Sequence, residues 1–207
     1  MRKIKAKSVI NKQYNIIERK EECDITYWYI IPEHMNSKEI YSENNKIGFA
    51  IQYFRKKYHI SQNKLCKGLC SAATLSRIES GERDADAFLL ETLLERMGQS
   101  PNKFELILTE DDKDFIQRRE EIQNQLDKKE FTTAYELLST YNNLVDSGGN
   151  VHKQFVKRTE AQLNELQGGT AKKTVELLNE AIIFTVPDFK THNIKDYYLS
   201  NTELNIK

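Results

Sequence analysis

Two parts of the chain resemble each other at a distance of forty residues, and this internal repeat constrains the fold most strongly. Residues 115–126 align with residues 155–166 and share phenylalanine, arginine, glutamate, asparagine and leucine at equivalent positions. The same distance separates the Glu-Leu-Leu sequence at 136–138 from its copy at 176–178. A period of this length is typical of helical hairpins that stack on one another, because a single hairpin cannot bury its apolar side.

Each copy predicts two helices joined by a turn, and the turns are expected at residues 127–129 and 167–169. A third unit is predicted to begin around Ile194, and the sequence stops at Lys207 before a second helix. Because such solenoids usually need three repeats and a polar cap, we expect an open end whose apolar side chains a second copy of the chain would bury. The expected exposed side chains are Ile182, Phe184, Phe189 and Tyr197. A fragment or a shortened relative of longer proteins is the alternative.

The composition agrees with an all-α fold. Only 8 of the 207 residues are glycine and 3 are proline, which argues against turn-rich β structure. No apolar run approaches the roughly 18 residues that a membrane span needs, and no secretory signal follows the basic N-terminus. The odd number of cysteines does not make a disulfide framework. We therefore expect a cytoplasmic protein without membrane contact.

The net charge is zero, but the charges are segregated along the chain. Residues 46–100 carry 9 basic and 6 acidic groups, whereas residues 101–207 carry 14 and 18. Between Lys46 and Arg77 there are seven lysine or arginine residues and no acidic residue. Such a segment suits a polyanion such as nucleic acid. A chance cluster on a solvated surface is the alternative.

Residues 1–45 are predicted to be an N-terminal extension that contains a strand or is partly disordered. Residues 24–32 are rich in β-branched and aromatic side chains and end in proline, as strands do. A lone strand cannot bury both faces, so this one must pack on another element or stay mobile. The remaining chain divides into a domain at residues 46–100 and a helical-repeat domain at residues 101–207.

Within residues 46–100 the apolar spacing predicts four helices. The first and the last are longer, and the two between them are short. Ser61 and Ser71 are the expected N-caps of the short helices, which end at Gly68 and Gly81. Two short helices joined by a tight turn form the helix-turn-helix plan, in which the second helix enters the major groove of DNA.

The predicted second helix, residues 72–79, has a suitable outer face. Leu75 and Ile78 are expected to point to the core, whereas small side chains beside Arg77 point away. Arginine can donate two hydrogen bonds to guanine, and alanine methyls can contact the methyl group of thymine. The alternative is an ordinary four-helix core in which Arg77 is a surface residue with no role in DNA binding.

Residues 60–83 resemble the helix-turn-helix of lambda-repressor-like (XRE-type) regulators. They are more similar to the Rgg/PlcR-like members of the RNPP family, Gram-positive regulators that sense peptide pheromones in quorum sensing. The resemblance rests on Leu65-Cys-Lys-Gly-Leu-Cys-Ser71 followed by Leu75-Ser-Arg-Ile-Glu-x-Gly81. It implies a transcriptional regulator whose C-terminal domain is a short TPR-like α-solenoid.

The resemblance also implies roles for individual residues. Gln62 would bind a phosphate, and Arg55 would pair with Glu79 and tie the first helix to the recognition helix. The candidate DNA-binding residues are Gln62, Asn63, Lys64, Lys67, Ser71, Ala72, Ala73, Thr74, Ser76 and Arg77.

Asn124 and Asn164 occupy equivalent positions in the first helix of each hairpin, which lines the concave face of such solenoids. Asparagine can donate to and accept from an extended peptide backbone, which is how the resembled family holds its pheromone. We therefore list both as candidate peptide-binding residues. The alternative is that both are solvated or cap-like surface residues.

Catalytic, metal and cofactor sites are not expected. Cys66, Cys70 and His59 lie close in sequence but lack the second Cys/His pair of a zinc module, so packing is the better interpretation. The sequence contains no nucleophile–base pattern, no Gly-rich phosphate loop and no motif of paired carboxylates.

The sequence therefore predicts a homodimeric DNA-binding transcriptional regulator, and a short signalling peptide is a candidate further partner. Two alternatives remain open. One is a ligand-independent repressor of a phage or mobile element, which would bind DNA equally well with or without host culture extract. The other is a helical-repeat protein-interaction adaptor with a vestigial helix-turn-helix, whose DNA binding would show almost no salt dependence.

Overall fold

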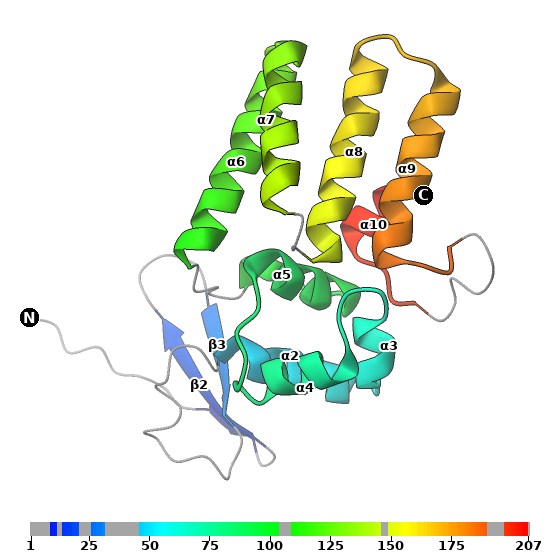
Figure 1. Ribbon diagram of the computed structural model, residues 1–207. Helices are drawn as coiled ribbons and strands as arrows, with labels where there is room; N and C mark the ends of the chain where they lie inside the picture. Colours follow the sequence, from blue (N-terminus) through cyan, green and yellow to red (C-terminus); the bar gives the residue numbers. More distant parts are fainter. Residues whose placement is uncertain are drawn as a thin grey trace, which may run out of the picture.

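The computed structural model describes residues 9–11, 14–20, 26–31, 46–103, 109–145, 149–189 and 197–206. Helices make up most of this structure, with two hairpins above a smaller bundle (Figure 1). The helical fold predicted from the sequence is thus confirmed from Lys46 onward. Within these residues, no helix has the length and apolar character that crossing a membrane requires.

A three-stranded antiparallel sheet precedes the helices. Its order is β1 (Val9–Asn11), β2 (Tyr14–Lys20) and β3 (Thr26–Ile31). β3 lies in the segment whose composition predicted a strand, and β2 pairs with it along its length, from Asn15 opposite Ile31 to Lys20 opposite Thr26. β2 therefore supplies the partner that β3 requires. The composition of the residues before β3 did not predict this strand.

Four helices form the first bundle, at the positions predicted from the spacing. They are α2 (Lys46–Lys57), α3 (Gln62–Cys66), α4 (Ala72–Glu79) and α5 (Ala87–Arg96), followed by the short 3₁₀ helix η2 (Pro101–Lys103). Their shared core contains side chains that are completely buried. These are Ile51, Leu65, Leu75, Leu93 and Leu94. Full burial of one such side chain contributes roughly 1.5–3 kcal/mol.

Two helical hairpins follow, with their turns at the positions that the repeat predicted. The first consists of α6 (Glu110–Asp127) and α7 (Phe131–Leu144), and the second of α8 (Asn150–Leu166) and α9 (Ala171–Thr185). The first hairpin and α8 share an apolar core, and α7 packs against α8. α5 lies against α8, so the bundle and the hairpins are in direct contact.

The C-terminal end differs from the expected open solenoid. The short helix α10 (Asn201–Ile206) packs against α9, and Ile182 and Tyr197 are only 2% and 7% exposed. Phe184 and Phe189 are half-buried. The expectation that these four side chains form an exposed apolar face was therefore wrong, because the chain covers this end itself. Ile194, where a third unit was expected to start, lies outside the described residues.

Candidate nucleic-acid interface

The local sequence defines both helices of the helix-turn-helix. Ser61 and Ser71 have extended backbones, and their hydroxyl oxygens accept hydrogen bonds from the N–H groups of Lys64 and Thr74 at 3.2 and 3.0 Å. N-caps of this kind typically contribute about 1 kcal/mol. Gly81 ends α4 in the left-handed conformation, with φ of 73°. The serine and glycine signals in the sequence thus mark the helix boundaries.

A buried ion pair joins α2 to the end of α4. Arg55 Nε and Nη2 donate to the two carboxylate oxygens of Glu79 at 2.5 and 2.7 Å, and Glu79 is buried. Arg55 also donates to the carbonyl oxygen of Ile60 at 3.0 Å. Because a bidentate pair fixes direction as well as distance, it sets the orientation of α4 relative to α2. This is the pair that the resemblance implied.

Gln62 extends the same cluster to α3. Its side-chain nitrogen donates to Glu79 Oε2 at 2.8 Å, so all three helices meet at one carboxylate. An amide nitrogen carries two hydrogens, and the second can still donate to a phosphate oxygen. Asn63, the next residue, is exposed. The start of α3 is therefore compatible with backbone phosphate contacts.

The outer face of α4 has the predicted character. Ala73, Ser76 and Arg77 are exposed, whereas Leu75 and Ile78 are buried. Within the described residues, the side chain of Arg77 has no ion pair and no hydrogen bond. An exposed arginine without a partner on a face of small side chains is available to a polar ligand.

The N-terminal turn of α4 presents hydroxyl groups. Ser71 Oγ and Thr74 Oγ1 are 2.9 Å apart, and Thr74 and Ala72 are half-buried. α2 can approach α4 closely because Gly48 has no side chain, and a Cβ there would collide with the carbonyl oxygen of Ile78. α4 therefore packs closely against α2 on one side, and its exposed residues Ala73, Ser76 and Arg77 are not part of this contact.

Two of the candidate lysines face the C-terminal half of the chain instead. Lys67 Nζ lies 2.9 Å from Asp188 Oδ2 and 4.3 Å from the ring centroid of Tyr197. The bond to Asp188 raises the pKa of the Lys67 ammonium group. Lys64 Nζ lies 5.1 Å from the ring centroid of Tyr198. We therefore do not retain Lys67 in the interface, because its charge is already compensated within the chain.

The basic run in the sequence is thus only partly available to a polyanion. Arg55 neutralises Glu79, and Lys67 neutralises Asp188. Lys56 and Lys57 at the end of α2 are exposed, as are Arg77 on α4 and Arg83 in the following loop. The charge count therefore overstates the free positive charge of this segment by two side chains, Arg55 and Lys67.

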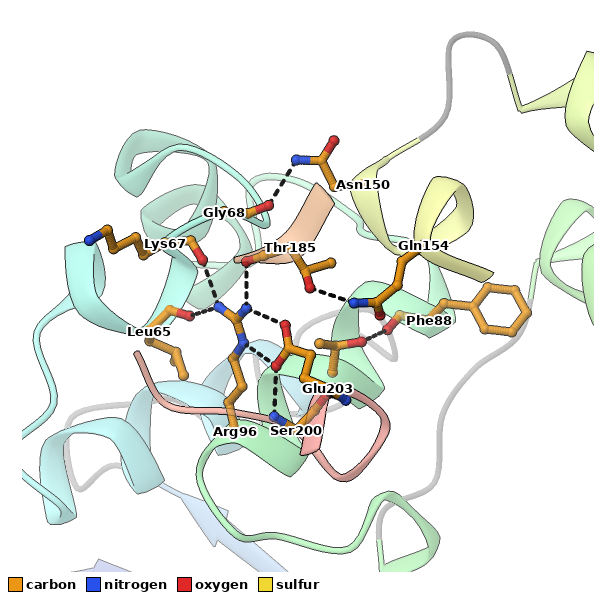
Figure 2. Close-up of polar contacts among 11 residues, drawn as sticks. Leu65, Lys67, Gly68, Phe88, Arg96, Asn150, Gln154, Thr185, Ser200 and Glu203 are labelled. Carbon is orange, nitrogen blue, oxygen red and sulfur yellow. Dashed lines mark hydrogen bonds and ion pairs between the residues drawn. The ribbon is translucent and has the colours of Figure 1, made fainter. Parts of the chain in front are cut away.

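Sequence reasoning missed a second polar cluster, which lies behind the turn between α3 and α4 (Figure 2). Arg96, the last residue of α5, is completely buried and forms an ion pair with Glu203 of α10, from Nη2 to Oε1 over 2.5 Å. Its Nη1 donates to the carbonyl oxygens of Leu65 and Lys67 at 3.0 and 2.7 Å. Its Nη2 also donates to the carbonyl oxygen of Thr185 at 3.0 Å.

One local signal could have pointed to this cluster. Ser200 and Glu203 have the spacing of a capping box, in which a serine begins a helix and a glutamate three residues later binds back. In the structure, the backbone N–H of Ser200 donates to Glu203 Oε2 at 2.7 Å, and the N–H of Glu203 donates to Ser200 Oγ at 3.2 Å. Nothing local predicts that the same carboxylate also binds Arg96.

The two candidate peptide-binding asparagines are placed differently from each other. Asn164 Nδ2 donates to Thr174 Oγ1 at 2.9 Å and to the carbonyl oxygen of Thr170 at 3.2 Å, so it joins α8 to the start of α9. Asn124 is exposed on α6. The donor group of Asn164 is therefore already engaged within its own hairpin, which agrees with the cap-like alternative.

The two cysteines near the turn interact with each other. A hydrogen bond from the Cys70 thiol lowers the pKa of Cys66 to about 7, although burial acts in the opposite direction. The same bond and burial raise the pKa of Cys70. His59 is exposed and does not form a metal-binding group with the two cysteines. In the described part of the chain, no three His, Cys, Asp or Glu side chains are grouped as metal ligands.

Comparison with known families agrees with this geometry. The family described as Helix-turn-helix matches residues 51–104, which run from α2 through α5 and η2. The chain has no significant match among curated proteins or among solved structures. Residues 51–104 are thus an XRE-type helix-turn-helix domain, the kind of domain that DNA-binding transcriptional regulators carry.

Proposed function

We propose that this chain is a sequence-specific transcriptional regulator that reads its operator with α4. The observation that carries the proposal is the exposed Arg77, which has no side-chain partner in the described residues and lies beside Ala73 and Ser76. Small side chains let the helix enter the major groove, and the guanidinium group can then donate two hydrogen bonds to a guanine. The caps and the Arg55–Glu79 pair hold α4 ready for this contact.

Phosphate contacts would fix the position of α4 on the duplex. Gln62 and Asn63 begin α3, where exposed N–H groups and side-chain amides can bind backbone phosphates. The proposed interface is the candidate set without Lys67, whose charge is compensated by Asp188. It consists of Gln62, Asn63, Lys64, Ser71, Ala72, Ala73, Thr74, Ser76 and Arg77.

Replacing Arg77 with alanine tests this proposal. We expect the substitution to weaken binding to the chain's own upstream DNA by about 1–3 kcal/mol and to reduce the preference for that DNA over a scrambled duplex. Arg118→Ala is the matched control, because Arg118 lies on α6 in an exposed ion pair with Asp114. If both variants bind like the unchanged chain, α4 is not the reading element.

We also propose that two copies bind together in the cytoplasm, since helix-turn-helix proteins commonly read two half-sites of a symmetric operator. Ile182 and Tyr197 are buried within the chain, so an exposed apolar end of the hairpins does not support a dimer. The proposed dimer rests on the symmetry of the operator alone. Sedimentation of the protein with and without a two-half-site duplex tests it. A single copy bound per duplex would contradict it.

Control by a signalling peptide rests on the resemblance at residues 60–83 and on a TPR-like interpretation of the hairpins. The internal hydrogen bonds of Asn164 favour the ligand-independent repressor instead. Anisotropy titrations with and without culture extract separate the two. A change in DNA affinity that disappears in the Asn124→Ala variant would support a peptide, and an unchanged affinity would support the ligand-independent repressor.

A further inference from the structure

The turn between α3 and α4 is held from the C-terminal half of the chain (Figure 2). Asn150 at the start of α8 donates from Nδ2 to the carbonyl oxygen of Gly68 at 2.8 Å. Arg96 donates to the carbonyl oxygen of the preceding residue, Lys67, at 2.7 Å. Tyr198 and Val151 pack against the apolar core of the bundle. The helix-turn-helix therefore shares its polar contacts and its core with residues that come much later in the sequence.

α3 depends on these contacts because it is short. It has five residues, far fewer than an isolated helix needs for stability in water. The carbonyl groups at the end of a helix lack partners within the helix. For α3, Arg96 binds two such carbonyls, those of Leu65 and Lys67. Arg96 thus caps the C-terminal end of α3 at the point where the turn begins.

The position of Arg96 is in turn fixed by the C-terminal segment. Its remaining N–H groups donate to Glu203 and to the carbonyl oxygen of Thr185, so all five donors of the guanidinium are used. Glu203 is also completely buried, and its second oxygen caps α10 through Ser200. One carboxylate therefore orders both the last helix of the structure and the arginine that holds the turn.

We propose that Arg96 and Glu203 are positioning residues for DNA binding, through which residues 197–206 set the angle between α3 and α4. Neither side chain reaches the exposed face of α4, since both are completely buried. Their effect on DNA is exerted through the carbonyl groups at the end of α3. This inference rests on the proposed function, because it assumes that α4 is the helix that contacts DNA.

Coupling of this kind is reciprocal. If docking of residues 197–206 favours the turn geometry that binds DNA, then DNA must favour docking of the same residues by the same factor. The C-terminal segment is therefore expected to become more protected from amide exchange when the duplex is bound. A segment that only stabilised the fold at large would show no such selective change.

The test replaces the pair with apolar side chains in the full chain. The variant carries Arg96→Met and Glu203→Leu together, since apolar replacement of a buried ion pair is often neutral for stability, whereas removal of one partner is not. Glu203→Gln is the second variant, which retains an oxygen for the Ser200 cap. The matched control replaces the exposed pair on α6, with Arg118→Met and Asp114→Leu.

Two readouts are taken from each variant. The first is affinity for the upstream duplex. We expect it to fall roughly tenfold or more in the Arg96 and Glu203 variants, within the range typical of coupled sites, and to stay unchanged in the Arg118 and Asp114 control. The second is amide exchange at Leu69 and Cys70, whose N–H groups donate to the carbonyl oxygen of Cys66 in the turn. We expect faster exchange there than in the unchanged chain, and unchanged exchange at Val145 at the end of α7.

Loss of affinity together with faster exchange in the turn supports the proposal. Unchanged exchange at Leu69 and Cys70 overturns it, because the turn would then not depend on Arg96. Faster exchange with unchanged affinity also overturns it, because the turn would then not control DNA binding. If the unchanged chain shows no preference for the upstream duplex, the proposed function fails, whereas the exchange data still decide whether Arg96 positions the turn.

Discussion

The backbone of Gly68 touches the carbonyl group of Thr185, although the two residues lie in different halves of the chain. A Cβ on Gly68 would collide with the carbonyl oxygen of Thr185 and would lie 2.7 Å from its carbonyl carbon. Gly68 also has a φ of 78°, in the left-handed region. The turn of the helix-turn-helix therefore needs glycine for two reasons, its own conformation and the close approach of the end of α9.

Gly68→Ala separates these two reasons when it is compared with Gly98→Ala. Gly98 has a φ of 71°, but a Cβ there meets nothing within 4 Å. We expect Gly98→Ala to cost about 1–2 kcal/mol for the left-handed conformation alone. Gly68→Ala should cost more, because the end of α9 must also move. Equal losses in urea unfolding would show that α9 does not press against the turn.

Glu79→Gln tests the ion pair that orients α4. The substitution keeps the size of the side chain but leaves Arg55, whose side chain is only 11% exposed, without its carboxylate. Removing one partner of a buried pair typically costs about 3–5 kcal/mol. Asp114→Asn, in the exposed pair on α6, is the control and should change the unfolding free energy by less than about 1 kcal/mol. A similar small loss for Glu79→Gln would contradict the role of the pair.

Asp86 gives the fold a dependence on pH. Burial raises the pKa of its carboxyl group, but the bonds to His152 and to the N–H of Leu89 outweigh burial and lower it. A carboxyl whose pKa is lowered on folding stabilises the native state above its unfolded pKa of about 4, and this contribution is lost as pH falls through the folded pKa.

Asp86→Asn should therefore destabilise the protein more at pH 7 than in strong acid. Asparagine is as good an N-cap as aspartate, so the change removes the charge and keeps the cap of α5. Urea unfolding at neutral pH and below about pH 3 measures the difference between variant and unchanged chain. A difference that stays constant with pH would show that the charge of Asp86 contributes nothing.

Lys67→Ala should leave DNA binding almost unchanged. Its ammonium group lies against Asp188 and Tyr197, and the carbonyl oxygen that Arg96 binds is retained in the variant. Each lost phosphate contact reduces the salt slope of binding by about one. We expect no such reduction for Lys67→Ala. A smaller salt slope for Lys67→Ala than for the unchanged chain would show that Lys67 contacts a phosphate.

The sequence predicted the helix-turn-helix well because its signals are local. Ser61 and Ser71 cap helices by bonding to N–H groups three residues away, and Gly81 ends α4 through its own backbone conformation. The apolar spacing likewise depends only on helix geometry. These features require no knowledge of distant parts of the chain.

The features that escaped prediction all depend on distant partners. Arg96 lies on a helix that the apolar spacing predicts, but its partner Glu203 is 107 residues away. From the sequence alone, Lys67 is a candidate phosphate ligand. Its ion pair with Asp188, far away in the sequence, shows that its charge is already compensated. Nor does any periodicity show that Ile206 of α10 shares an apolar cluster with Ile182 of α9, because the two residues lie far apart in the sequence.

The most direct test of the account is fluorescence anisotropy of the unchanged chain with its own upstream duplex and with a scrambled duplex across a salt series. We predict a preference for the upstream duplex that persists as salt rises, because base contacts depend less on salt than phosphate contacts do. Equal, weak binding to both duplexes that disappears with salt, or no binding at all, would contradict a sequence-specific regulator.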